Sequence, residues 1–231
     1  MSREFTKLVE KELAEMAKEL GFKKKKTFFV RQVNEYLSYI LVFSIATQQI
    51  KGHVLVCPQI GVCYKEINNM IEKMTEYSYF STIQLALGYV MPVENWFDFD
   101  FVEGQDNSHA LEALKANIIT YGYPFVSKLS TLEGLLAYYE IDKRDDNGFK
   151  YEHLPIIYYM LGDKAKAMKI IEDKIAENKR QCMNDSVTTS EWEDDISETS
   201  SVQVRQYDKE YEEFAERFKQ LPEKYSPDDW K

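Results

Sequence analysis

The sequence has few cysteine, histidine, glycine and proline residues, and each shortage excludes a class of protein. Its three cysteines are an odd number without paired spacing, so we expect no disulfide framework and a reducing compartment. Nine glycines and six prolines among 231 residues exclude collagen-like chains and chains dominated by linkers. With three histidines in the chain, no Ser–His or Cys–His catalytic pair can be recognised.

Long apolar runs are also lacking. The most apolar stretch, residues 36–46, is much shorter than the roughly 20 residues that a membrane-spanning helix needs. The beginning, MSREFTKLVEKELAEM, is charged from its third residue and has no apolar signal region, so we expect a cytoplasmic protein. Glycine-rich phosphate loops, dinucleotide fingerprints and nucleophile elbows are absent from the sequence, so we expect no cofactor.

The composition otherwise suits a folded protein with an acidic surface. Hydrophobic residues make up 44% and aromatic residues 14%, which is enough for a packed core. The net charge is −10, and residues 181–204 contribute −6 of it because they contain six carboxylates and no lysine or arginine. An acidic balance argues against nucleic acid or an anionic membrane as a direct partner and leaves a basic protein as the expected one.

The first part of the chain predicts an α+β domain over residues 1–105. Apolar residues at helical spacing over 5–20 predict an opening amphipathic helix, which Gly21 ends. Strand-like runs follow, joined by short connections that favour an antiparallel or mixed sheet. These expected strands cover residues 27–33, 36–47, 53–64 and 82–91, with a short helix near 67–74.

Residues 106–231 predict a helical region. The pair of helices over 153–180 resembles half of a tetratricopeptide-type hairpin, but only one copy is present, so a stacked array is not expected. Residues 183–203 are rich in serine, threonine and acid, which predicts a mobile acidic loop. A last amphipathic helix follows this loop.

The stretch ENWFDFDFVEGQD, residues 94–106, most resembles a functional site. On a strand, Asp98 and Asp100 lie on one face about 7 Å apart, and the phenylalanines lie on the other. Two such carboxylates could bind a divalent metal with help from Glu94 or Glu103. The alternative is an acidic surface that faces water or a protein partner. We favour the second interpretation, because a hydrolytic metal site usually recruits another ligand type and only His109 lies near in sequence.

Two sets of contact residues follow from this interpretation. The predicted partner-binding residues are Glu94, Trp96, Asp98, Asp100 and Glu103. The acids of the predicted loop form a weaker second patch, made of Glu191, Glu193, Asp194 and Asp195.

A zinc site is a further alternative. His53, Cys57 and Cys63 are spaced too widely for a zinc site and alternate with apolar residues, so we expect no catalytic residue and no metal ligand among them.

The beginning of the chain resembles the bacterial family known as domain of unknown function 4304. The residues that carry the resemblance are Phe5, Leu8, Leu20, Gly21, Phe22, Lys24, Phe28 and Arg31. The resemblance implies an α+β fold and supplies no catalytic residues.

The general build is also similar to bacterial toxin-immunity proteins, which are small, acidic and without catalytic motifs. We therefore expect a non-enzymatic protein-binding module, an immunity or regulatory factor that neutralises a basic protein such as a toxin. The alternatives are a metal-dependent hydrolase that uses Asp98 and Asp100, and a peptide-binding helical scaffold.

Overall fold

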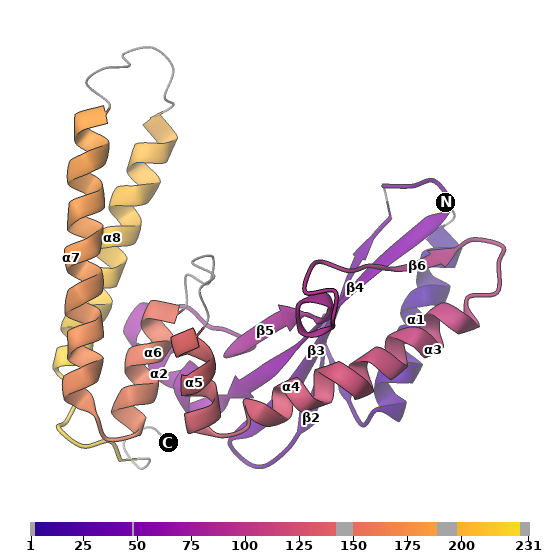
Figure 1. The fold of residues 1–231 in the computed structure, drawn as a ribbon, viewed down its shortest axis with the longest axis horizontal. Coiled ribbons are helices and arrows are strands. Elements are labelled where there is room, and N and C mark those ends of the chain that lie inside the picture. The colour runs from indigo at the N-terminus through magenta and orange to yellow at the C-terminus, as the bar shows by residue number, and fades with distance from the viewer. Residues whose placement is uncertain (1–2, 48, 142–149, 189–197, 227–231) are drawn as a thin grey trace. The chain divides into compact units, whose positions relative to one another are not determined.

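The computed structural model describes residues 3–47, 49–141, 150–188 and 198–226, and over 181–188 and 198–208 only the backbone (Figure 1). The chain divides into two compact units. Unit 1 contains residues 1–65 and 80–135, and unit 2 contains residues 66–79 and 136–231. Each unit is described by itself below.

Unit 1 consists of an opening helix, a sheet and a helical segment that packs on the sheet. Its helices and turns are α1 (Arg3–Glu19), η1 (Leu87–Val90), α3 (Ser108–Asn117), η2 (Ile118–Gly122), α4 (Tyr123–Lys128) and the start of α5 (Leu132–Ile141). Its strands are β1 (Lys23–Lys25), β2 (Phe28–Gln32), β3 (Leu37–Ala46), β4 (His53–Tyr64), β5 (Ile83–Ala86) and β6 (Phe99–Val102).

The six described strands form one antiparallel sheet in the order β1-β2-β3-β4-β5, and β6 also pairs with β4. β5 pairs with residues 59–62 of β4, and β6 pairs with residues 53–56 of the same strand. The two short strands therefore lie one after the other along the same edge of β4. The α+β class and the antiparallel sheet that the sequence predicts are both confirmed.

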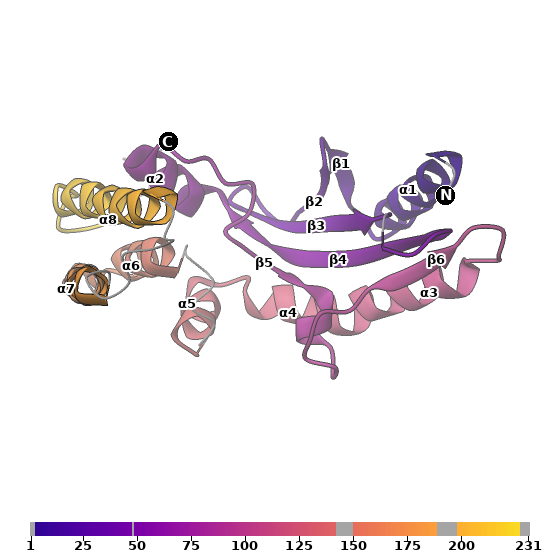
Figure 2. The ribbon, with the colours of Figure 1, turned by 90° about the horizontal axis from the view of Figure 1, so that it is seen from above.

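Side chains alternate between the two faces of this sheet, and the first face is the core of unit 1. Val54, Val56, Ile60 and Val62 of β4 are fully buried on it. The helical segment packs on this face, since Tyr64 donates a hydrogen bond to the carbonyl oxygen of Leu129 at 2.8 Å. Figure 2 shows α3 and α4 running along this side of the strands.

The end of α1 joins the same core. Gly21 takes the left-handed conformation with φ of 83°, and the Phe22 amide donates to the Ala17 carbonyl at 2.9 Å, which ends the helix as predicted. The Tyr123 hydroxyl of α4 donates to the Leu20 carbonyl at 2.8 Å. The guanidinium of Arg31 on β2 lies over the ring of Tyr123 at 5.2 Å.

Unit 2 is helical. It contains α2 (Lys65–Thr75), the end of α5, α6 (Lys150–Met160), α7 (Lys164–Thr188) and α8 (Glu198–Lys219). The helix α6 is buried over residues 153–159, so it forms the centre of the unit. Arg217 of α8 donates to the carbonyl of Met74 at 2.7 Å, and the Tyr225 hydroxyl donates to Glu66 at 2.9 Å, which joins α2 to the C-terminal segment.

Three expectations differ from the structure. The strand expected over 82–91 ends at Ala86, and a 3-10 turn replaces its second half. In the loop expected over 183–203, residues 183–188 belong to α7 and residues 198–203 to α8, and residues 189–197 lie outside the described residues. The compact units also divide the chain differently from the predicted boundary at 105/106, since α3 and α4 pack on the sheet.

Candidate functional site

The candidate site is the connection between β5 and β6. Because both strands pair with β4, the chain must leave the sheet after Ala86 and return at Phe99. We call residues 89–98 the acidic–aromatic loop. Its large apolar side chains are exposed in unusual number for ten residues, with Tyr89 at 41%, Val93 at 48%, Trp96 at 52% and Phe97 at 37% of full exposure.

The backbone of this loop is held against η1. A side chain at Gly88 would place its Cβ 2.1 Å from the Asn95 carbonyl oxygen and 2.8 Å from Cβ of Phe97, so only glycine permits this close approach. Glu94 adopts a left-handed conformation with φ of 48°, and its amide donates to the Met91 carbonyl at 3.0 Å. The loop is therefore a defined turn.

Trp96 and Asp98 are joined directly. The indole Nε1 donates a hydrogen bond to Oδ1 of Asp98 at 3.0 Å, while half of the Trp96 side chain stays exposed. This bond orients a large aromatic side chain beside a carboxylate. A tryptophan fixed in this way loses little conformational freedom when a partner covers it, which favours binding.

Asp100 is paired with a residue that the sequence-based site omitted. Nδ1 of His53 lies 2.9 Å from both carboxylate oxygens of Asp100. The two residues lie on the second face of the sheet, diagonally across the β4–β6 pair. The sequence placed only His109 near these carboxylates, because the register that brings β6 beside the beginning of β4 cannot be derived from the sequence.

Asp98 also changes the chemistry of Cys57. Burial, and secondly the negative charge of Asp98, raise the pKa of the Cys57 thiol to about 12. Cys57 has 1% of its surface exposed. The thiol is thus protonated and covered, which excludes it as a nucleophile at neutral pH.

The far end of β6 is closed by one asparagine. The Asn107 side chain accepts a hydrogen bond from the Val102 amide at 2.8 Å and donates to the Val102 carbonyl at 3.1 Å. Glu103 follows in an exposed turn, where its amide donates to the Gly52 carbonyl at 2.9 Å. Hydrogen bonds from the Ser108 amide and hydroxyl hold the pKa of Asp106 below its usual value.

The five predicted contact residues therefore occupy one edge of unit 1. Glu94, Trp96 and Asp98 lie in the acidic–aromatic loop, Asp100 lies on β6, and Glu103 lies in the turn after it. The phenylalanines were expected on the opposite face, and Phe99 and Phe101 are buried there. Phe97 differs and is exposed, because it precedes the first residue of the strand.

The structure bears on the two alternative sites as well. Within the described residues, no group of three or more histidine, cysteine, aspartate or glutamate side chains could hold a metal ion. The second acidic patch, Glu191, Glu193, Asp194 and Asp195, lies outside the described residues.

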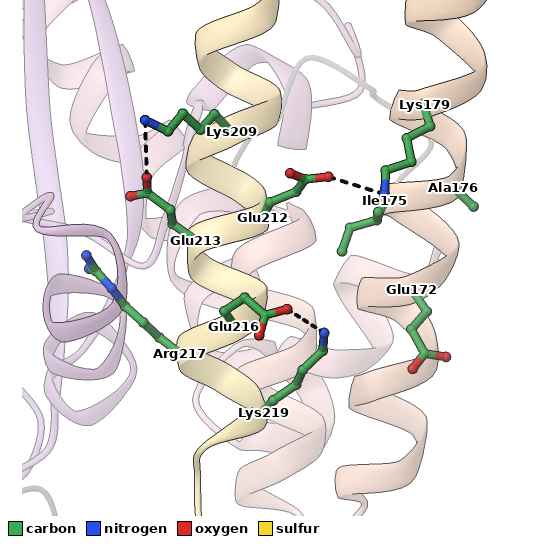
Figure 3. A pocket seen from close by; sticks show the side chains of 10 residues that line it. All are labelled: Glu172, Ile175, Ala176, Lys179, Lys209, Glu212, Glu213, Glu216, Arg217 and Lys219. Atoms are coloured by element: carbon green, nitrogen blue, oxygen red, sulfur yellow. Dashed lines mark hydrogen bonds and ion pairs between the residues drawn. The ribbon is translucent and has the colours of Figure 1, made fainter.

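The peptide-binding alternative rests on the helix pair over 153–180, which corresponds to α6 and α7 of unit 2. The cleft between α7 and α8, about 790 Å³ in volume, is lined mainly by charged side chains (Figure 3). Three ion pairs lie across or along it, Lys179–Glu212 at 3.4 Å, Lys209–Glu213 at 3.8 Å and Lys219–Glu216 at 2.6 Å. Its apolar lining is limited to Ile175 and Ala176 together with the stems of the charged side chains.

The fold and this edge define an α+β protein with an antiparallel sheet, helices on one face and an acidic, aromatic loop at one side. The model of the family Domain of unknown function (DUF4304) matches residues 13–128, which is half of the chain, and the chain belongs to this family. The match covers the second half of α1 from Leu13, the whole sheet and the segment from α3 to α4. Neither the curated proteins nor the solved structures gave a match. No described helix is long and apolar enough to cross a membrane.

Proposed function

We propose that this chain is a non-enzymatic module that binds a basic protein through the acidic–aromatic loop, as an immunity or regulatory factor. The observation that carries the proposal is the half-exposed Trp96 side chain, oriented by its hydrogen bond to Asp98. Tryptophans of this kind are enriched among the residues that dominate binding energy.

The surroundings of Trp96 support the same kind of partner. Asp98 lies against Trp96, and Glu94, Asp100 and Glu103 add negative charge along the same edge of unit 1, so a lysine- or arginine-rich surface would be steered toward it. Arginine suits this site best, since its guanidinium stacks on an aromatic ring and forms two hydrogen bonds to a carboxylate. The proposed compartment is the cytoplasm, where the free thiols of Cys57 and Cys63 stay reduced.

Binding to the products of the reading frames that flank the gene tests the proposal. Each product is purified and titrated calorimetrically with the full chain, with Trp96→Ala and with Asp98→Asn/Asp100→Asn. We expect one basic product to bind, and Trp96→Ala to weaken it by about 2 kcal/mol, roughly thirtyfold. The double aspartate variant should slow association and reduce the dependence of affinity on salt.

Matched controls come from the same unit. Tyr36→Ala removes an aromatic side chain that is 45% exposed in the β2–β3 turn. Glu4→Gln/Glu10→Gln removes two exposed carboxylates of α1. Both controls should bind like the unchanged chain. If the loop variants bind as tightly as the controls, the loop is not the binding site.

A further inference from the structure

The second face of the sheet, opposite the helices of unit 1, has no charged side chain on β2, β3 or β5, or on β4 beyond His53. Charged residues make up 29% of the chain, so this depletion calls for a cause. The fifteen positions follow from strand alternation and register, and they are Phe28, Val30, Gln32, Ser38, Ile40, Val42, Ser44, Ala46, Leu55, Cys57, Gln59, Gly61, Cys63, Gln84 and Ala86. Depletion of charge is the compositional sign of the centre of a protein interface.

The polar groups at the middle of this face bond to one another. The Gln59 side chain donates to the Ser44 hydroxyl at 2.9 Å, and the Gln84 side chain donates to Gln59 at 3.0 Å. These bonds run across three neighbouring strands. The half-buried Val42 and Leu55 lie beside them. Such a surface offers few unmatched polar groups and can be covered at low cost.

Charge returns at the two edges, with opposite signs. Lys23 and Lys25 of β1 lie on the second face, since their partners on β2 are Val30 and Phe28, and both are exposed. We call them the lysine edge. Asp98 and Asp100, at the β6 side, form the aspartate edge. The surface is thus neutral in its centre, positive at one side and negative at the other.

We propose that a second copy of this chain packs face to face on this surface, with a two-fold axis parallel to the strands. That rotation turns the second sheet over and exchanges its two sides. The lysine edge of each copy then lies on the same side as the aspartate edge of the other, with Lys25 about two residues along the strands from Asp98, and the contact forms twice. A two-fold axis across the strands would place lysine opposite lysine, which repulsion disfavours.

The area is sufficient for such a dimer. One residue on a sheet face covers about 33 Å², from a strand spacing of about 4.8 Å and a repeat of about 6.8 Å. Four of the fifteen positions, Ile40, Cys57, Gly61 and Ala86, are already buried within the chain. The other eleven and the four edge residues supply roughly 500 Å² per copy, or about 1,000 Å² in total. This is the lower limit of specific interfaces, so the dimer is reversible.

The dimer also regulates the binding site, a consequence that rests on the proposed function. Asp98 and Asp100 contribute to both surfaces, so the second copy and a basic partner compete for them. Self-association is measured with this chain alone, and the proposed function is measured by binding to another protein. A negative result in one experiment can therefore be told apart from a negative result in the other.

Sedimentation equilibrium of the full chain tests the dimer. We expect a monomer–dimer equilibrium that Gln59→Lys weakens by at least about tenfold, because it places a charge at the centre of the face. Gln105→Lys makes the same change at an exposed turn outside the face and should leave the equilibrium unchanged. Val42→Lys is the second face variant if Gln59→Lys does not give a folded circular dichroism spectrum.

Zero-length carbodiimide cross-linking tests the orientation. In a mixture of isotopically light and heavy chains, the expected products join the lysine edge of one to the aspartate edge of the other. The variant Lys23→Glu/Lys25→Glu should weaken the dimer. When the same chain also carries Asp98→Lys/Asp100→Lys, the two edges again have opposite charges and the dimer should be restored. A chain that stays monomeric at high concentration, or a dimer that Gln59→Lys and Val42→Lys leave unchanged, would overturn the proposal.

Discussion

Nδ1 of His53 is within 2.9 Å of both carboxylate oxygens of Asp100, although the two residues are 47 positions apart in the chain. The pair joins the beginning of β4 to β6 on the second face of the sheet. It holds the acidic edge against the long central strand. It also gives one carboxylate of the candidate site a hydrogen-bond partner within the chain.

The His53–Asp100 pair should add little to stability. The side chains keep 28% and 44% of their exposure, so water and salt screen the interaction. A double-mutant cycle with His53→Ala and Asp100→Ala, followed by urea unfolding, should give a coupling energy below about 1 kcal/mol that decreases with added salt. A coupling of several kcal/mol would show that the pair is far less exposed in solution.

Thr131 should stabilise α5 as its N-terminal cap. Its hydroxyl oxygen accepts a hydrogen bond from the Gly134 amide at 3.0 Å. Thr131→Ala removes this acceptor and should lower the free energy of unfolding by about 1 kcal/mol. Thr131→Ser keeps the hydroxyl and serves as the control. Equal losses in the two variants would contradict a capping role.

Glu152 should make stability depend on pH. Burial at the start of α6, and secondly the charge of Glu210, raise its pKa from the usual 4.5 to about 7. Between these two values the folded chain retains a proton that the unfolded chain has released. The free energy of unfolding therefore falls as the pH rises through this window, and the loss is complete above about pH 7.

Replacing Glu152 by glutamine removes this dependence. At a pH above the window, Glu152→Gln should raise the free energy of unfolding by up to about 3 kcal/mol. Below the window, Glu152 is protonated in both the folded and the unfolded state, so the unchanged chain and the Glu152→Gln variant should have nearly equal stability. Glu172→Gln, at an exposed position of α7, is the control. Thermal unfolding across the pH range measures the difference, and a gain at low pH alone would contradict the assignment.

Cys57 should resist thiol reagents while the chain is folded. With a pKa of about 12 its thiolate is scarce at neutral pH, and its side chain is buried. In a Cys182→Ser background, iodoacetamide should modify the half-buried Cys63 first and Cys57 only after unfolding, as mass spectrometry of the peptides would show. Asp98→Asn should change the Cys57 rate little, because burial is the larger cause of its raised pKa.

The periodicity of the sequence predicted most elements of unit 1. Strand-like apolar runs located β3 and β4, and Gly21 located the end of α1, because these signals are local. The strand expected up to Met91 failed after Ala86. There the alternation of Leu87, Tyr89 and Met91 continues, but η1 has to place Gly88 against Asn95, and tertiary contact overrides the local pattern.

The candidate site was predicted in composition but not in pairing. Carboxylates that alternate with phenylalanines indicated a strand with one solvent-exposed face and one buried face. Phe99 and Phe101 are indeed buried on the face opposite the carboxylates. The contact of His53 with Asp100 depends on the register between β4 and β6, which is set by long-range packing. The uncharged centre of the second face could not be predicted for the same reason, since it is assembled from strands that are distant in sequence.

The tandem arrangement of β5 and β6 along β4 has a further consequence for how this family can diversify. β5 and β6 each pair with β4, and the segment that connects them pairs with neither strand. Residues added near the exposed Val93 would therefore lengthen this connection without changing the register of either strand pair. The scaffold thus tolerates insertions in the acidic–aromatic loop while the sheet that carries the loop stays the same.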